Sequence, residues 1–250
     1  MSKVKLSKRL EVVASSVGSG GTVADIGCDH GFTSIYLTEN KMAKCGIAMD
    51  INKGPLEKAK IHIEQAGLKD KIETRLSNGL DKLEIGEADT ILISGMGGAL
   101  ITEILTKEKD KTLSAKELVL SPQSEIYLVR KCLHELGFFI QCEKMVFDMG
   151  KYYVVIRALR KDVSVKSELG LEKCSEVSDA EMYDEADYVY GRYLIENKDK
   201  VFCEFLEKER KRMERVIDAL KRNGMSETEI GKQKIFSEYN LLRQTLLRMH

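Results

Sequence analysis

A glycine-containing turn at residues 25–31 carries the clearest chemical signal in the sequence. It reads Asp-Ile-Gly-Cys-Asp-His-Gly, follows a β-branched run and precedes a helical pattern. Turns of this kind bind cofactors because glycine lets the backbone bend tightly and approach a ligand. Asp29 occupies the second glycine of the dinucleotide fingerprint G-x-G-x-x-G, where a carboxylate would repel a pyrophosphate at the helix N-terminus. The sulfonium and ammonium of S-adenosylmethionine are cations, so Asp29 favours that cofactor over a nicotinamide dinucleotide.

We expect this turn to contact the cofactor through five residues: Asp25, Gly27, Asp29, His30 and Gly31. His30 either orients the methionine end or meets the acceptor, or it is a hydrogen-bonding residue of the fold. A strand-to-helix turn without any ligand is the alternative for the whole motif.

Two further turns follow the next two strands. Asp50, followed by Ile51, ends the second strand, and its carboxylate can accept hydrogen bonds from both ribose hydroxyls of an adenosyl group. Alternatively, Asp50 caps the next helix together with Asn52. Ser77, Asn78 and Gly79 form a turn that can present an amide to the adenine edge, or they are an ordinary turn. Because ligands of open α/β sheets bind at the carboxyl ends of the strands, these residues predict a single site.

Polar and glycine residues also follow the fourth and fifth strands. Residues 94–98, Ser-Gly-Met-Gly-Gly, indicate a backbone held close to the transferred group or the acceptor, or a tight packing turn. Gln123 has the amide donor and carbonyl acceptor needed to bind a nucleobase edge, or it caps a helix starting at Ser124.

The elements that position these turns predict an α/β fold. Helical patterns lie between the first five of seven β-branched runs that predict strands. The seven runs are 22–28, 45–51, 71–77, 88–94, 116–121, 138–147 and 152–159. One helical stretch has Leu56, Ala59 and Ile63 at helical spacing before Gly67. This βαβ series predicts a parallel sheet, and the turn at 148–150 predicts an antiparallel hairpin at its end.

The strand pattern stops near residue 161, so we expect a second domain over 162–250. Residues 168–187 are acidic and poor in apolar side chains, as in a linker. One long helical pattern then follows, ending at Asn223 and Gly224, with apolar residues near heptad spacing at Leu194, Val201, Phe205, Met213, Val216 and Leu220. Ser226 and Glu229 form a capping box before a second helix, which predicts an antiparallel, coiled-coil-like hairpin.

The composition excludes several classes of protein. The 40 basic and 40 acidic residues balance, so any nucleic-acid surface must be a local patch. The six cysteines form no C-x-x-C pair, and there is no H-E-x-x-H motif, so no metal site is expected. No apolar stretch is long enough to span a membrane. Free thiols without an export signal indicate a cytoplasmic protein.

The chain resembles the bacterial tRNA methyltransferases that modify N1 of adenine 22 in the D arm. The matching segments lie at 24–31, 50–60, 76–80, 93–98, 120–123 and 190–202, in the order of the family. Gln123 stands where the family usually has Asn, and Cys28 where a small hydroxyl residue is usual. The resemblance implies a class I, Rossmann-like methyltransferase domain over residues 1–161 that binds S-adenosylmethionine, followed by a helical tRNA-binding domain.

The implied reaction is in-line methyl transfer to a flipped-out adenine. N1 of adenine has an in-plane lone pair, so the protein has to position the base and stabilise the charge developing on it. The candidate catalytic residues are Asp29, Gly95, Met96 and Gln123, and Gly95 is also a candidate cofactor contact. A basic cluster at Lys208, Arg210, Lys211, Arg212 and Arg215 is either a phosphate-contact face or a solvated helix with internal ion pairs.

The partner implied is tRNA, with the protein a monomer or a weak dimer and without a membrane partner. Two alternatives are a small-molecule methyltransferase and a non-catalytic protein that binds S-adenosylmethionine. A charged helical hairpin suits a large folded substrate better than it suits a lid over a small one.

Overall fold

The computed structural model describes residues 4–18, 20–161, 183–226, 228–229 and 234–249. The chain divides into two compact units, of which the first ends at Met182 and the second begins at Tyr183. The expected boundary at 161/162 and most of the expected acidic linker lie outside the described residues.

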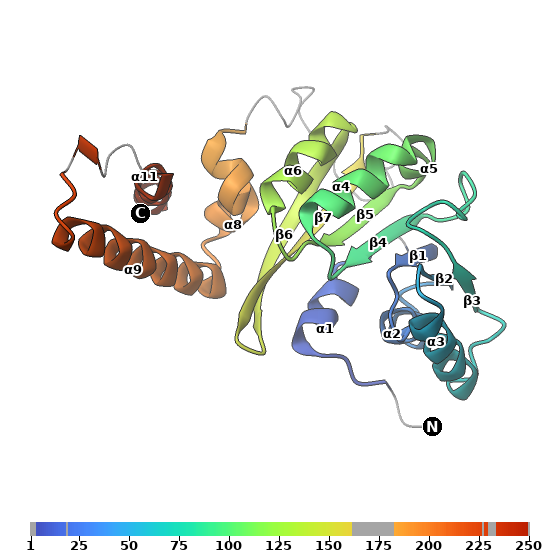
Figure 1. Cartoon of the computed structure of the whole chain (residues 1–250). Helices are drawn as coiled ribbons and strands as arrows, with labels where there is room; N and C mark the ends of the chain where they lie inside the picture. The colour runs from blue at the N-terminus through green and yellow to red at the C-terminus, as the bar shows by residue number, and fades with distance from the viewer. Residues whose placement is uncertain (1–3, 19, 162–182, 227, 230–233, 250) are drawn as a thin grey trace. The chain divides into compact units, whose positions relative to one another are not determined.

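The first unit is built on a seven-stranded sheet, as expected (Figure 1). The strands are β1 (Thr22–Ile26), β2 (Cys45–Asp50), β3 (Ile72–Leu76), β4 (Thr90–Ser94), β5 (Glu117–Ser121), β6 (Phe138–Asp148) and β7 (Lys151–Arg160). Their order is β3-β2-β1-β4-β5-β7-β6, with β1 to β5 parallel and β7 antiparallel to both neighbours. The chain moves outward from β1 to β3 and then crosses to β4 through turns over residues 77–89, where the sequence predicted a helix. The strand order therefore reverses between β1 and β4, where such sheets bind ligands.

Six helices cover the two faces of this sheet: α1 (Lys8–Ala14), α2 (Phe32–Glu39), α3 (Lys53–Gln65), α4 (Gly98–Lys107), α5 (Lys109–Ser114) and α6 (Ile126–Glu135). Figure 1 shows α1, α2 and α3 on one side of the strands and α4, α5 and α6 on the other. Because both faces are covered, Ile91, Leu92 and Ile93 of β4 are completely buried. This is why the inner strands are continuous apolar runs rather than alternating ones.

The hairpin of β6 and β7 confirms the turn expected at residues 148–150. Met149 and Gly150 both have positive φ, 45° and 82°, as in the two-residue turns that match strand twist. Because β7 runs antiparallel to β5, the tip of the hairpin lies toward the carboxyl ends of the parallel strands. Asp148 at this tip accepts a hydrogen bond from the backbone N–H of Arg9, at 3.0 Å, and so connects α1 to the hairpin.

The second unit is helical, as expected, but its first helical pattern is not continuous. A short π-helix, η2 (Asp187–Gly191), leads into α8 (Arg192–Asn197), which ends at Lys198 with a left-handed φ of 50°. The Asp199 carboxylate then caps α9 (Lys200–Arg222) by accepting the backbone N–H groups of two of its first residues. Residues 185–186 are already helical and lead into η2, so the helical segment starts before the end of the linker expected over 168–187.

The buried face of α9 differs from the expected one. Phe202, Leu206 and Ile217 are buried, whereas Val216 is exposed. The expected positions Val201, Phe205 and Val216 are each one residue too early, which turns the face by about 100° around the helix. Met213 belongs to both patterns and is buried.

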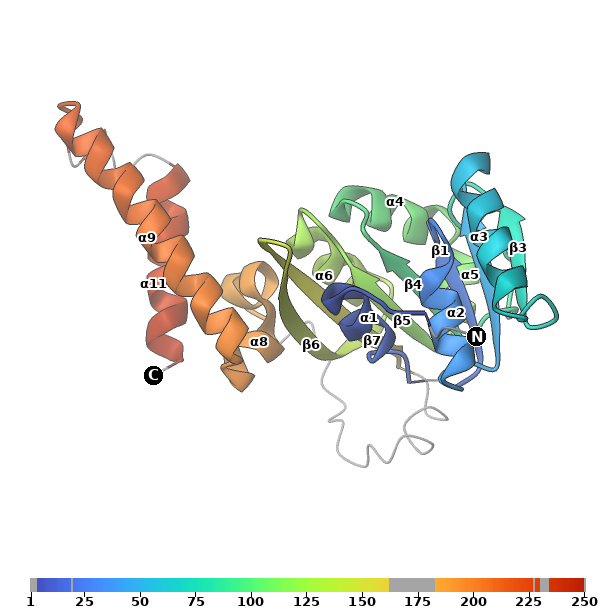
Figure 2. The ribbon, with the colours of Figure 1, turned by 90° about the horizontal axis from the view of Figure 1, so that it is seen from below.

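Helices α9 and α11 (Lys234–Arg248) form the antiparallel pair that the sequence predicts. Figure 2 shows them side by side and running in opposite directions. The Tyr239 hydroxyl donates to Glu214 Oε1 at 3.0 Å across the pair. The expected capping box is present, since Ser226 Oγ accepts from the N–H of Glu229 and Glu229 accepts from the N–H of Ser226. Among the helices described here, none is both long enough and apolar enough to cross a membrane.

Candidate functional site

The glycine turn after β1 is fastened to the end of β2. The backbone N–H groups of Gly27 and Cys28 both donate to the Met49 carbonyl, at 2.8 and 2.9 Å. Gly27 has a φ of 73°, and a Cβ there would lie 2.4 Å from Cε of Met96. Glycine at this position therefore lets the loop after β4 approach the turn after β1.

Gly31 has a packing role in the same turn. Its φ is 73°, and a Cβ would lie 3.1 Å from Cβ of Ala59 on α3. A side chain at this position would be strained by the left-handed backbone and would press on α3. Gly31 therefore sets how closely α2 and α3 approach one another.

Asp25 lies under the turn. Its side chain is buried, and Oδ2 accepts a hydrogen bond of 2.8 Å from the Ser34 hydroxyl on α2. Burial raises the pKa of Asp25 to about 6, with a smaller contribution in the same direction from the neighbouring Asp50. A carboxylate in this environment favours a cationic ligand close by.

The same surroundings make Cys28 unreactive. Burial, together with the carboxylates of Asp25, Asp50 and Asp29, raises the pKa of the Cys28 thiol far above its usual range. The thiolate is the nucleophilic form of cysteine, so Cys28 is a packing residue of the turn.

Asp50 and Asp29 meet at the carboxyl ends of β1 and β2. Asp50 Oδ2 accepts the backbone N–H of Asp29 at 3.3 Å, and Oδ1 accepts the N–H of Asn52 at 2.8 Å. Asp29 has a φ of 50°, and its side chain is 69% exposed. The Asp50 carboxylate is therefore fixed in place, while the Asp29 carboxylate faces solvent beside it. Asn52 is the N-cap residue of α3, but its side chain makes no capping hydrogen bond and Asp50 accepts the N–H of Asn52 itself, so the two side chains do not cap the helix as the alternative expected.

The His30 ring takes part in an aromatic cluster. Its centroid lies 5.7 Å from Phe32 and 5.9 Å from His62, and His62 Nδ1 is 3.0 Å from the His30 carbonyl oxygen. His30 Nε2 lies 3.5 Å from Oδ1 of Asp29. The ring packs in the fold, but its buried Nδ1 has no hydrogen-bond partner among the described residues, so these contacts do not choose between the alternatives for His30.

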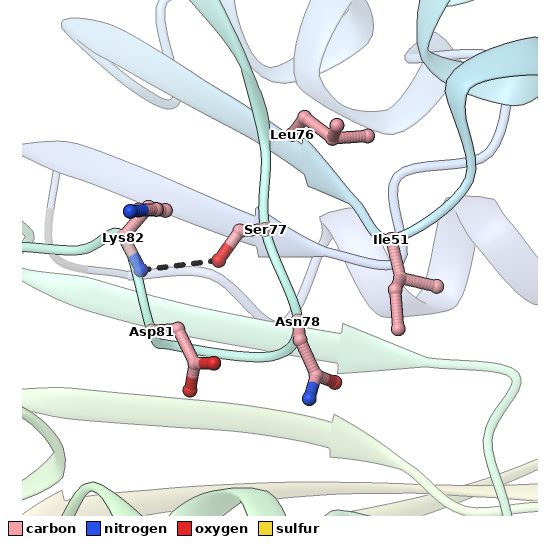
Figure 3. A pocket seen from close by; sticks show the side chains of 6 residues that line it. All are labelled: Ile51, Leu76, Ser77, Asn78, Asp81 and Lys82. Atoms are coloured by element: carbon pink, nitrogen blue, oxygen red, sulfur yellow. Dashed lines mark hydrogen bonds between the residues drawn. The ribbon is translucent and has the colours of Figure 1, made fainter.

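A pocket of about 250 Å³ opens at the ends of β2 and β3 (Figure 3). Its lining is Ile51, Leu76, Ser77, Asn78, Asp81 and Lys82. Ile51 and Leu76 are 59% and 43% exposed, so apolar surface borders the pocket. Within the described part of the chain, the Asn78 side chain has no hydrogen-bond partner. An apolar wall with one available amide fits a purine ring.

Ser77 and Gly79 shape this pocket. The Ser77 hydroxyl donates to the Gly79 carbonyl at 3.0 Å and accepts from the Lys82 N–H at 3.1 Å. Gly79 has a φ of 56°, and a Cβ there would lie 3.0 Å from Cγ1 of Ile104. Both residues hold the loop, which leaves Asn78 as the one member of this turn with a side chain available to a ligand.

The loops after β4 and β5 pair with each other. The Gln123 N–H donates to the Met96 carbonyl at 2.9 Å, and the Gly98 N–H donates to the Ser124 carbonyl at 2.9 Å. A Cβ on Gly98 would lie 2.4 Å from the Glu125 carbonyl oxygen. The packing interpretation of the 94–98 turn therefore holds at Gly98.

Gln123 does not cap a helix. Helix α6 begins at Ile126 with Glu125 as its N-cap, two residues later than the sequence predicted. The exposed Gln123 side chain places Nε2 at 3.6 Å from where a Cβ on Gly95 would be. Gln123 is thus beside Gly95 at the ends of two adjacent strands, where it can meet an acceptor.

Arg9 is the site residue that the sequence analysis missed. It comes from α1, and its Nη1 donates to the Ser94 hydroxyl at 3.0 Å. Its guanidinium lies 5.1 Å from the centre of the Tyr153 ring. A Cβ on Gly95 would lie 3.6 Å from Arg9 Nη1. No local signal marks Arg9, because a single arginine in an N-terminal helix looks like a surface residue.

Two arginines of the basic cluster of α9 are engaged in ion pairs. Arg210 pairs with Glu207 and Glu214 at 3.0 and 2.7 Å, and Arg212 pairs with Glu209 at 2.8 Å. These contacts favour the solvated-helix interpretation for the two arginines. The described residues contain no group of three or more side chains suited to hold a metal ion.

Comparison with known proteins adds to this geometry. Residues 6–156 match a family described as a methyltransferase domain. The chain is 32% identical over 235 residues to the tRNA (adenine(22)-N(1))-methyltransferase of Bacillus subtilis, covering 94% of this chain and 93% of the relative.

Solved structures agree over the same length. The crystal structure of the B. subtilis m1A22 tRNA methyltransferase has a TM-score of 0.79 and 31% identity, covering 97% of this chain and 99% of the other. A putative tRNA (m1A22) methyltransferase of Streptococcus pneumoniae, in complex with S-adenosyl-L-methionine, has a TM-score of 0.78 and 29% identity, covering 97% and 100%. Both likenesses extend through the helical unit as well as the sheet unit.

Proposed function

This chain belongs to the family of tRNA (adenine(22)-N(1))-methyltransferases, and we propose that it transfers the methyl group of S-adenosylmethionine to N1 of adenine 22 in tRNA. The observation that carries the proposal is the extent of the likeness to the B. subtilis enzyme. The match to a methyltransferase domain ends at residue 156 and fits any methyl acceptor. The 94% coverage includes the helical unit as well, which a small-molecule methyltransferase would not share.

The cofactor fits the turns after β1, β2 and β3. The fixed Asp50 carboxylate would accept the ribose hydroxyls, and Ile51 and Leu76 would cover the faces of the adenine. The Asn78 amide would bind the adenine edge, and buried Asp25 would favour the cationic end. When bound, S-adenosylmethionine supplies a methyl group on a sulfonium, which is an electrophile.

The acceptor belongs at the ends of β4 and β5. N1 lies on the Watson–Crick edge of adenine, so the base has to leave its stack to reach the site. We infer that Gln123 reads that edge, because the Met96 carbonyl holds its backbone and its side chain lies beside Gly95. Its carbonyl oxygen would stabilise the positive charge that develops on the base. Asp29 remains a second candidate for this stabilisation, since its exposed carboxylate is anchored next to Asp50.

Transfer of labelled methyl groups tests the proposed function. The purified chain, incubated with labelled S-adenosylmethionine and unmodified tRNA, should give 1-methyladenosine at position 22. The matched control is the same tRNA with guanine at position 22, which should stay unlabelled. Labelling of the control tRNA, or labelling of small molecules alone, would contradict the proposed substrate.

We infer further that the protein acts in the cytoplasm, where its tRNA substrate is found, and that it is a monomer or a weak dimer. The five cysteines among the described residues are all free thiols, as in a reducing compartment. Light scattering at micromolar concentration measures the oligomeric state, and a stable higher oligomer would contradict this expectation.

A further inference from the structure

Arg9 differs from most of the arginines in the sheet unit. Arg75, Arg130 and Arg157 each bind a glutamate, and Arg160 binds backbone carbonyls. The Arg9 guanidinium instead contacts a neutral hydroxyl and an aromatic ring, with no carboxylate partner among the described residues. The nearby Asp148 carboxylate accepts the backbone N–H of Arg9. Among the described residues, Arg9 is thus a cation without a fixed counter-charge.

The guanidinium is nevertheless held in place. The Ser94 hydroxyl accepts from Nη1 at 3.0 Å, and the Tyr153 ring lies 5.1 Å from the guanidinium carbon. Helix α1 packs against β5, β6 and β7, and Asp148 anchors its backbone. A guanidinium oriented in this way keeps further N–H donors in a rigid plane, the geometry that suits a phosphate.

Its location is the acceptor side of the site. A Cβ on Gly95 would lie 3.6 Å from Arg9 Nη1 and 3.6 Å from Gln123 Nε2, so the two side chains flank the end of β4. A guanidinium beside the acceptor base would repel it during the reaction, because methylation at N1 gives the adenine a positive charge. An anion bound to Arg9 removes this repulsion, and each nucleotide of the substrate carries such an anion in its phosphate.

We propose that Arg9 binds the backbone phosphate of the nucleotide whose adenine enters the site, and so holds the base in its flipped-out position. This inference rests on the proposed function and names the group that fixes the acceptor. Ser94 and Tyr153 are the positioning residues of the guanidinium.

The test compares three variants of the full chain, Arg9→Ala, Arg9→Lys and Lys8→Ala, in methyl transfer to unmodified tRNA. Lys8 is the matched control because it is an exposed cation next to Arg9 on the same helix. Loss of one charged hydrogen-bonding group should lower kcat/KM for tRNA about tenfold to a hundredfold in Arg9→Ala. Arg9→Lys should keep the charge but recover only part of the activity, and Lys8→Ala should stay close to wild type.

Salt dependence separates a phosphate contact from a structural defect. For Arg9→Ala, the slope of log affinity against log salt should become shallower by about 0.7 to 0.9, the value for one neutralised phosphate. Arg9→Lys should retain the wild-type slope. Calorimetry should show unchanged affinity for S-adenosylmethionine in all three variants.

Three results would overturn the inference. One is wild-type kcat/KM in Arg9→Ala, and another is an equal loss in Lys8→Ala. The third is weakened cofactor binding with an unchanged salt slope, which would assign the anion to the cofactor carboxylate. If Arg9→Ala does not fold, the Ser94→Ala variant tests the inference instead, because it removes the hydrogen bond that orients the Arg9 guanidinium. This variant should lower kcat/KM severalfold at unchanged cofactor affinity. A wild-type chain that fails to methylate tRNA refutes the proposed function itself, whereas the variants bear on Arg9 alone.

Discussion

Replacing Asp25 by asparagine should stabilise the folded protein at neutral pH and weaken its binding of S-adenosylmethionine. Asp25 is buried, and its pKa is raised from 3.8 to about 6. At pH 7 the folded chain therefore holds an ionised carboxylate away from water, at a cost in free energy. Asparagine has nearly the same shape and retains an oxygen that can accept the Ser34 hydroxyl. The substitution thus removes the charge and leaves the packing in place.

The size of the effect follows from the pKa. The shift from 3.8 to about 6 corresponds to about 3 kcal/mol of unfolding free energy, since one pKa unit is worth about 1.4 kcal/mol. Between these two pH values the folded state holds the Asp25 proton and the unfolded state does not. The Asp25 contribution is therefore fully present below about pH 4 and is lost as the pH rises through 6. An asparagine side chain does not titrate, so the variant keeps this stability at neutral pH.

Urea denaturation at several values between pH 4 and pH 7.5 measures the difference. The free energy of unfolding of Asp25→Asn minus that of wild type should rise by about 3 kcal/mol across this range. The control is Asp70→Asn, which makes the same change of side chain at an exposed aspartate. Calorimetric titration at pH 7.5 should show weaker cofactor binding in Asp25→Asn alone.

A pH-independent difference for Asp25→Asn would refute the reasoning, because it would mean that burial does not raise the pKa of this carboxyl group. If the variant is stabilised as expected but binds the cofactor with unchanged affinity, burial does raise the pKa of Asp25, but Asp25 does not contribute to cofactor binding.

Three more predictions address other parts of the molecule. Asp50→Ala should weaken S-adenosylmethionine binding by about 1 to 3 kcal/mol in calorimetry, since it removes a carboxylate placed to accept the ribose hydroxyls; unchanged affinity would exclude Asp50 from the site. Gly98→Ala should lower the unfolding free energy by about 1 to 3 kcal/mol in urea, because its Cβ would lie 2.4 Å from the Glu125 carbonyl oxygen; wild-type stability would show that the loop can shift. Charge reversal at Lys211 should lower tRNA affinity and make the salt slope shallower by about 0.7 to 0.9, whereas reversal at Arg212, which pairs with Glu209, should change both less; an unchanged slope with full activity in the Lys211 variant would mean that the cluster is a solvated helix face.

Local patterns were sufficient to predict the strands of the sheet unit but not all of its helices: α1 was not predicted, and the helix expected between the third and fourth strands is replaced by turns. Each inner strand is a short apolar run bounded by turn residues, and the turn at Met149 and Gly150 depends on two adjacent backbone conformations. The buried face of α9 was predicted wrongly, because both the 201/205 and the 202/206 positions are apolar. Only packing against a partner chooses between two such faces. The break at Lys198 was missed although Asp199, the N-cap of α9, is a residue type that favours the start of a helix.

The candidate cofactor residues could be predicted because they lie in turns that directly follow strands, and parallel strands bring such turns to one edge. The sequence alone therefore determined Asp50, Asn78 and the glycine turn as candidates. The raised pKa of Asp25 depends on burial, which a sequence position does not reveal. Arg9 depends on contacts with Ser94 and Tyr153, which are 85 and 144 positions away along the chain. A pattern reports on neighbours within a few residues, whereas the position of Arg9 comes from packing α1 against the far end of the sheet.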